Sequence, residues 1–247
     1  MKKIVCAILA CAMCASVAVS FSGCGCENKK TKNTNSNSNS AGYKVETTAP
    51  DLEDENFGYY KLNNKEVKVT VYKGNEKNVT IPETVDGHSI TVVGHSIFQA
   101  NDNIESVTLP DTVTEIQDYA FSTCKNLTKV NIPEGVKTIG QNAFWNCQKL
   151  EEITLPSTLK KIDWYAFSAT GLKSVTIPES TTLTELKEKV FFQCASLTEV
   201  NLPLTITKIS ADTFEQCSDD LVIKAYNGSY GISYAKQNNI KFEELAR

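Results

Sequence analysis

The chain has 247 residues, of which 41% are hydrophobic and 22% are charged, and its formal net charge is −4. The negative balance excludes the basic surface that nucleic-acid binding requires, so we expect no nucleic-acid partner. The chain contains two histidines, His88 and His95, so few residues are available for histidine-based catalysis or metal binding.

The first 23 residues have the pattern of an export signal. Lys2 and Lys3 form a positively charged start, residues 4–21 are apolar and rich in alanine, and Ser22 and Gly23 are small residues of the kind that precede a cleavage point. We therefore expect residues 1–23 to be a signal peptide. A membrane-spanning anchor is the alternative, although the apolar stretch is near the lower length limit for spanning.

The residues around the expected cleavage point, Phe21-Ser22-Gly23-Cys24, resemble a bacterial lipobox, with Phe21 where that motif usually has leucine. The resemblance implies that Cys24 becomes the lipidated N-terminus of the mature protein. It also implies an exported protein that is bound to the membrane through its lipid anchor. Such a protein lies at the cell envelope, on the outer face of the cytoplasmic membrane or at the cell surface.

Residues 24–56 follow, and after Cys24 they contain few apolar side chains. The run KKTKNTNSNSNS is rich in asparagine and serine. A segment of this composition does not bury enough surface to offset the entropy lost on ordering. We therefore expect a flexible tether, with a reach of roughly 30 Å.

Residues 57–103 are expected to form an N-terminal β cap and a degenerate first repeat. The stretch GYYKLNNKEVKVTVYKGNEKNVTIP has the alternation of a strand pair, and Lys73-Gly74-Asn75 is a plausible turn. The stretch VTIPETVDGHSITVVGHSIF is the degenerate repeat, with Pro82 and Phe98 as its markers. The cap should cover the end of the repeat array, because a bare end would aggregate.

Five clear repeats occupy residues 104–220 and start at residues 104, 127, 150, 172 and 197. Each begins with an apolar-x-x-V/I-x-I/L-P stretch, and one proline and one phenylalanine recur at fixed points in every copy. The prolines are Pro110, Pro133, Pro156, Pro178 and Pro203. The phenylalanines are Phe121, Phe144, Phe167, Phe191 and Phe214.

Repeats of 20–29 residues with alternating leucine, valine and isoleucine are the signature of leucine-rich repeats. The alternation predicts a short strand with one buried face, and proline ends it because proline does not donate to a sheet ladder. The A-F-x-x-C part predicts a 3₁₀ or short helical turn. We therefore expect a β-rich repeat solenoid, a right-handed superhelix capped at both ends, in which equivalent residues stack on one another.

The full pattern, L-x-x-V-x-I-P-x-x-V-x-x-I-x-x-x-A-F-x-x-C, resembles the treponemal or BspA-like class of leucine-rich repeats. That class occurs on bacterial surface proteins, so the resemblance implies a binding protein. The tail of residues 221–247 looks like the usual C-terminal cap of that family. Within it, Ser229 can cap a helix that runs to Gln237, and residues 240–245 should cover the last repeat.

One cysteine recurs in four of the five repeats, and Thr170 replaces it in the remaining copy. The cysteines are Cys124, Cys147, Cys194 and Cys217. Their spacing follows from the repeat and lacks the C-x₂-C clustering of a metal site. We interpret them as buried thiols that act as apolar filling, and we expect no metal, no cofactor and no catalytic residue.

Two sets of side chains are candidates for a binding surface. The first is a column of outward strand positions, for which a polar ladder without a ligand is the alternative: Thr108, Asn131, Thr154, Thr176 and Asn201. The second is a group of aromatic residues near the A-F turn, for which packing between neighbouring turns is the alternative: Tyr119, Trp145, Trp164 and Tyr165.

These patterns predict a cell-surface lipoprotein that is not an enzyme. It presents a repeat surface for adhesion or for binding a protein or glycan ligand, because solenoids use extended surfaces for recognition. The alternative is a structural envelope lipoprotein or scaffold without a specific external ligand.

Overall fold

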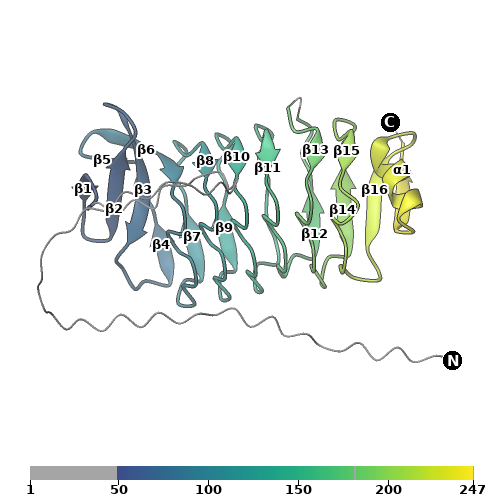
Figure 1. Cartoon of the computed structure of the whole chain (residues 1–247), viewed down its shortest axis with the longest axis horizontal. Helices are drawn as coiled ribbons and strands as arrows, with labels where there is room; N and C mark the ends of the chain where they lie inside the picture. Colours follow the sequence, from purple (N-terminus) through teal and green to yellow (C-terminus); the bar gives the residue numbers. More distant parts are fainter. Residues whose placement is uncertain (1–48, 181, 247) are drawn as a thin grey trace, which may run out of the picture. The chain divides into compact units, whose positions relative to one another are not determined.

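The structure is a computed structural model that describes residues 49–180 and 182–246. In this described part the chain forms a β-solenoid with one short helix (Figure 1). The five repeats form successive coils, which we call rungs 1 to 5. The expectation of a β-rich repeat solenoid is confirmed.

The L-x-x-V stretches form the first strand line, because their alternate residues face the core. Val107, Val175 and Val200 are buried, whereas the residues on either side of each point outward. The strands of this line run parallel in two separate sheets. The strands are β4 (Asn78–Thr80), β7 (Ser106–Thr108) and β9 (Lys129–Asn131), then β12 (Ser174–Thr176), β14 (Glu199–Leu202), β16 (Val222–Tyr226) and β17 (Lys241–Leu245).

The second apolar stretch of each repeat forms a second strand line. It begins beside the N-terminal cap and is also divided, because β11 in rung 3 does not pair with β13 in rung 4. Its strands are β6 (His88–Val93), β8 (Glu115–Ile116), β10 (Thr138–Ile139) and β11 (Lys161–Ile162), then β13 (Glu185–Leu186) and β15 (Lys208–Ile209).

The core contains a column of phenylalanine rings. Phe121, Phe144 and Phe167 are fully buried, and their neighbouring ring centroids are 5.0 and 5.2 Å apart with almost parallel planes. The same stacking continues to Phe98 on one side and to Phe191 and Phe214 on the other. The prediction that equivalent phenylalanines stack in one internal column is confirmed.

The A-F-x-x-C segments form successive β-turns in place of the expected 3₁₀ or helical turns. In rung 1 the amides of Ala120, Ser122 and Cys124 each donate to the carbonyl three residues earlier. Tyr119, directly before this segment, and Thr123, within it, have positive φ angles of 59° and 60°. A 3₁₀ helix requires negative φ at every residue, so these two positions interrupt it.

An N-terminal cap of antiparallel strands covers the degenerate repeat that precedes rung 1, and it starts earlier than the sequence predicts. Its strands are β1 (Leu52–Glu53), β2 (Phe57–Lys61), β3 (Glu66–Tyr72) and β5 (Thr84–Val85). Strand β1 lies in the segment 24–56 that we assigned to the tether. It pairs with β2, and in the turn between them Asp54 accepts hydrogen bonds from the amides of Asn56 and Phe57.

The hairpin of this cap closes at a different turn from the expected one. The amide of Leu62 donates to the carbonyl of Glu66, and the side-chain oxygen of Asn63 accepts from the amides of Lys65 and Glu66. The expected turn residues, Lys73-Gly74-Asn75, instead connect β3 to β4, which belong to different sheets.

The C-terminal cap consists of β16, helix α1 (Tyr230–Gln237) and β17. The hydroxyl of Ser229 accepts a hydrogen bond from the amide of Ile232, and the helix ends at Asn238, as the sequence predicts. Tyr234 of α1 packs edge-on against Phe214 at 6.1 Å and covers the end of the phenylalanine column.

Candidate binding surfaces

The predicted polar column lies on the outer face of the first strand line. Thr108, Thr154 and Thr176 are exposed, as is Asn131, while Asn201 is half-buried. The ladder pairs Thr108 with Asn131 and Thr176 with Asn201. The structure therefore brings four of the five residues together in two pairs, and Thr154 stands between them without a ladder partner.

The two asparagines of this column are held by bonds within the solenoid. The side chain of Asn131 accepts a hydrogen bond from the Leu109 amide at 2.8 Å and donates to the Leu109 carbonyl at 3.0 Å. The Nδ2 of Asn201 donates to the Thr176 hydroxyl of the previous rung at 3.3 Å, and to Glu199 of its own rung at 3.0 Å. These bonds stabilise the stacking of rungs, so the polar-ladder alternative accounts for both amides.

The first strand line is interrupted at rung 3. In the described part of the chain, residues 152–155 form no backbone hydrogen bond with either β9 or β12, and the nearest inter-rung bond joins the Lys173 amide to the Glu151 carbonyl at 3.1 Å. Ile153 is half-buried, whereas Val130 and Val175 at the same repeat position are buried. Backbone amides and carbonyls of residues 152–155 are therefore left for solvent or a ligand.

Unequal repeat lengths accompany this interruption. Rung 3 has 22 residues and rung 4 has 25, by the distances between successive repeat starts. The longer rung brings the hydroxyls of Ser180 and Thr182 to the Leu159 carbonyl, at 2.9 and 3.1 Å. These side-chain bonds occupy the corner between the two strand lines, beside the place where β11 and β13 fail to pair.

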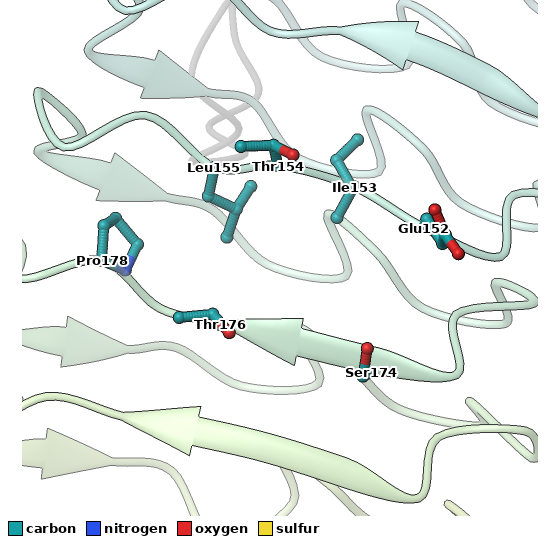
Figure 2. Close-up of a pocket in the computed structure, with 7 residues that line it drawn as sticks. All are labelled: Glu152, Ile153, Thr154, Leu155, Ser174, Thr176 and Pro178. Atoms are coloured by element: carbon teal, nitrogen blue, oxygen red, sulfur yellow. The ribbon is translucent and has the colours of Figure 1, made fainter.

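A hollow of about 390 Å³ opens at the interruption (Figure 2). Glu152, Thr154 and Leu155 lie on its rung 3 side, and Ser174 and Thr176 of β12 lie on the other. Two predicted residues, Thr154 and Thr176, thus line one hollow. Glu152 and Ser174 were absent from the predicted site, and the uneven repeat spacing was the sequence signal that could have indicated them.

The predicted aromatic residues lie on the turn side of the solenoid. The side chains of Trp145 and Trp164 are 39% and 45% exposed, whereas Tyr119 and Tyr165 are half-buried. The turns that contain the two tryptophans stack on each other, because the Asn142 amide donates to the Trp164 carbonyl at 3.0 Å.

Cationic side chains contact part of this aromatic group. The Nζ of Lys187 lies 5.1 Å from the ring centroid of Trp164, within cation–π range. The Nζ of Lys189 lies 5.5 Å from the ring of Tyr165. Tyr119 instead packs edge-on against His95 at 5.5 Å. The structure therefore does not unite all four aromatic residues in one patch.

Two carboxylates beside this group have opposite pKa shifts. Burial acts to raise the pKa of Asp163, but hydrogen bonds from Lys161 and Lys187, at 2.5 and 2.9 Å, outweigh it and the pKa is lowered. Burial raises the pKa of Asp118, and the hydrogen bond from the Gln141 amide offsets this only in part. Asp163 remains charged and holds Lys187 against Trp164, across the interruption between rungs 3 and 4.

The repeat cysteines are fixed by bonds to the phenylalanine carbonyls. The thiol of Cys124 donates to the Phe98 carbonyl at 2.9 Å, and Cys147 donates to Phe121 at 3.1 Å. Burial raises the pKa of Cys124 to about 12 and raises that of Cys147 well above its usual value. Because the thiolate is the reactive form, Cys124 and Cys147 serve as filling.

Three further features concern metal binding, membrane spanning and lipidation. Among residues 49–180 and 182–246, no three His, Cys, Asp or Glu side chains are grouped so that they could hold a metal ion. The single helix in that part is too short and too polar to cross a membrane. Cys24, the expected lipidation site, lies outside the described residues.

Several solved structures have a fold similar to that of this chain. A leucine-rich repeat protein of Treponema pallidum is similar over 79% of this chain and 99% of its own, with 22% identity and a TM-score of 0.59. A leucine-rich repeat protein of Bacteroides ovatus gives 23% identity, a TM-score of 0.53, and coverage of 72% of this chain and 56% of its own. The pneumococcal vaccine antigen PcpA gives 19% identity, a TM-score of 0.57, and coverage of 73% and 44%. At these identities the likeness shows the fold.

Family membership comes from the repeats themselves. No curated protein sequence matches the chain significantly. The model of the BspA type leucine rich repeat region, however, matches six copies over residues 91–220, which is more than half of the chain. The chain therefore belongs to the BspA-type leucine-rich repeat family.

Proposed function

We propose that this protein is exported, is held at the cell envelope through lipidated Cys24, and presents its solenoid as a binding surface for an external protein or glycan. In this proposal the chain binds and does not catalyse. The observation that supports it best is the exposure of two tryptophans on stacked turns, in a solenoid whose repeated apolar residues are otherwise buried.

A partner that covers the exposed tryptophans would remove two large aromatic surfaces from water. Repeat packing does not require them, because the positions of Trp145 and Trp164 hold serine and glutamine in neighbouring rungs. An aromatic ring with a polar N–H provides a large contact area and a hydrogen bond, which suits recognition of proteins and glycans. The hollow beside Thr154 and Thr176 adds polar groups on the strand side.

A surface location is supported by the family and by one similar structure. The pneumococcal protein with the same fold is described as a vaccine antigen. An exposed location for this chain also agrees with the lipobox-like residues at Cys24, which would make the membrane its first partner.

The proposal is tested by adhesion of cells that express the full-length chain. Changing both Trp145 and Trp164 to alanine should lower attachment to extracellular-matrix proteins or glycan-coated surfaces by about tenfold or more, because buried aromatic anchors dominate binding energy. The control is Tyr230→Ala, which removes a 39% exposed aromatic on α1 at the C-terminal end.

Location is read from the same cells. The wild-type chain should fractionate with membranes, and Cys24→Ser should release it to the soluble fraction. Cys26→Ser should not, because Cys26 lies two residues beyond the lipobox-like motif. Attachment that is unchanged in the double tryptophan variant, with its circular dichroism spectrum intact, would show that the aromatic residues are structural and would leave the envelope scaffold as the function.

A further inference from the structure

A second hollow lies on the turn side of the solenoid, away from the strand-side hollow. Its volume is about 570 Å³. The floor is made by small residues of rung 3, which are Ala169, Thr170 and Gly171. The walls are made mainly by carboxamide side chains from the neighbouring rungs, which are Asn146, Gln148, Gln193 and Gln216.

The hollow exists because rung 3 is short and has small side chains at this corner. Ala169 occupies the repeat position that holds Asn146, Gln193 and Gln216 in other rungs, and all four residues have positive φ angles between 55° and 60°. At Gly171, an added Cβ would lie 2.2 Å from the Gln148 carbonyl oxygen. Glycine is thus required for the chain to take the shorter path to the next rung.

The chemistry of the walls indicates a polar, uncharged ligand. The side-chain Nε2 of Gln148 donates to the side-chain oxygen of Asn146 at 3.0 Å, and the Nε2 of Gln193 donates to the side-chain oxygen of Gln216 at 2.9 Å. Each carboxamide has two donors and an acceptor with two lone pairs, so one bond per pair leaves most of this capacity open. None of the described residues that line the hollow is Asp, Glu, Lys, Arg or His.

Aromatic residues adjoin two of the wall residues in the sequence, although neither aromatic residue lines the hollow. Trp145 directly precedes Asn146, and Phe192 directly precedes Gln193. The residue between them in the repeat column is Ser168, which is buried, while Trp145 is 39% exposed. The hydroxyls of an uncharged sugar both donate and accept hydrogen bonds, as carboxamides do, so these walls fit an uncharged glycan better than an apolar peptide anchor.

We propose that this hollow binds an uncharged glycan, with Gln193, Gln216 and Gln148 as hydrogen-bonding residues. The proposal rests on the proposed binding function and assigns it a ligand class and a place on the turn side. The size of the hollow is within the range of small-ligand sites and suits one or a few sugar units.

The test uses the full-length chain on an array of short uncharged oligosaccharides, with sialylated and sulphated oligosaccharides and peptides beside them. Titration calorimetry then follows the uncharged oligosaccharide that binds most strongly. Ala169→Gln should weaken this binding by about tenfold or more, because the new side chain fills the floor. The variant is compatible with the fold, since Gln193 and Gln216 already occupy this position at φ angles of 59° and 60°.

The matched control is Thr123→Gln. Thr123 has the same repeat position and a φ angle of 60° in rung 1, and it does not line the hollow. Its affinity should stay within about twofold of wild type. Gln193→Ala, which removes one exposed wall amide, should weaken binding by about threefold to tenfold.

Failure of this inference can be told apart from failure of the proposed function. Wild-type affinity in both Ala169→Gln and Gln193→Ala, or binding that is confined to charged glycans or peptides, would overturn the assignment of the hollow. If adhesion still depended on Trp164, which does not line the hollow, the proposed function would stand without it. If Ala169→Gln lowers the melting temperature markedly, Gln193→Ala decides the outcome.

Discussion

Each phenylalanine of the repeat contacts the phenylalanine of the next rung, and this contact repeats from Phe98 to Phe214. The planes of Phe144 and Phe167 differ by 3°, with their ring centroids 5.2 Å apart. Tyr72 and Tyr234 close the two ends of the column through edge contacts of 5.3 and 6.1 Å. The column therefore has no ring face open to water at either end.

The column predicts a large stability effect at its centre. We expect Phe144→Ala to lower the free energy of unfolding by about 3–5 kcal/mol, because it removes a fully buried ring and leaves a cavity between two others. Urea unfolding of the two proteins measures the difference. Phe192→Ala, at a half-buried ring, should cost clearly less, and equal losses for the two variants would contradict the buried-column account.

For individual residues, the sequence predicts which side chains are buried but not which hydrogen bonds they form. A fixed spacing is enough to place the phenylalanines and cysteines in the core, since stacking brings like residues together. It does not reveal that the amide of Asn131 bonds Leu109 in the previous rung, or that the Thr170 hydroxyl donates within its own turn to Phe167 at 2.8 Å. Those bonds depend on side-chain geometry that the repeat pattern does not contain.

At the scale of elements, the turns differ from expectation because contacts between rungs override local preference. Tyr119 and Tyr165 have φ angles of 59° and 58°, which aromatic residues adopt rarely. The Tyr119 amide nevertheless donates to the Gln141 carbonyl of the next rung at 2.9 Å. Such bonds repeat along the solenoid and fix the backbone, and a single-repeat pattern gives no sign of them.

The interrupted strand line predicts a local difference in amide exchange. We expect the amides of Ile153, Thr154 and Leu155 to exchange roughly 100-fold faster than those of β14, which has ladder partners on both sides. The reason is that the amides of residues 153–155 have no backbone acceptor in the described structure. Hydrogen–deuterium exchange followed by mass spectrometry or NMR measures both segments in one sample.

The same exchange experiment can contradict the interruption of the first strand line. Protection of Ile153 and Thr154 equal to that of β14 would mean that rung 3 forms a regular strand in solution. In that case the hollow of Figure 2 would close, and the strand-side surface would be a continuous polar ladder.

For the whole molecule, repeat periodicity was sufficient to predict the architecture, and irregularities in the period explain what was missed. Equal rungs predict one continuous sheet along each strand line. The 22-residue and 25-residue rungs break both lines, and the same short rung creates the amide-lined hollow on the turn side. Both candidate sites therefore arise where the chain departs from its own repeat.

The junction between rungs 3 and 4 is joined mainly by its turn side. There the amides of Phe167 and Ala169 donate to the next rung at 2.9 and 2.8 Å, and the Asp163–Lys187 ion pair adds to them. On the strand side the links are the Lys173 amide to the Glu151 carbonyl and the side-chain bonds to the Leu159 carbonyl. Neither strand line crosses this junction. In a linear array, stability is the sum of each coil and its nearest-neighbour interfaces, so this interface is the weakest coupling between adjacent rungs.

The consequence is a limit on cooperativity. We expect urea to unfold the array in two blocks, because loss of order that spreads from one end stops where neighbouring coils are least coupled. Both tryptophans lie in rungs 2 and 3, so their fluorescence reports the N-terminal block alone, whereas far-ultraviolet circular dichroism reports the whole array. The two curves should have different midpoints, and coincident curves would mean that the broken ladders do not divide the molecule energetically.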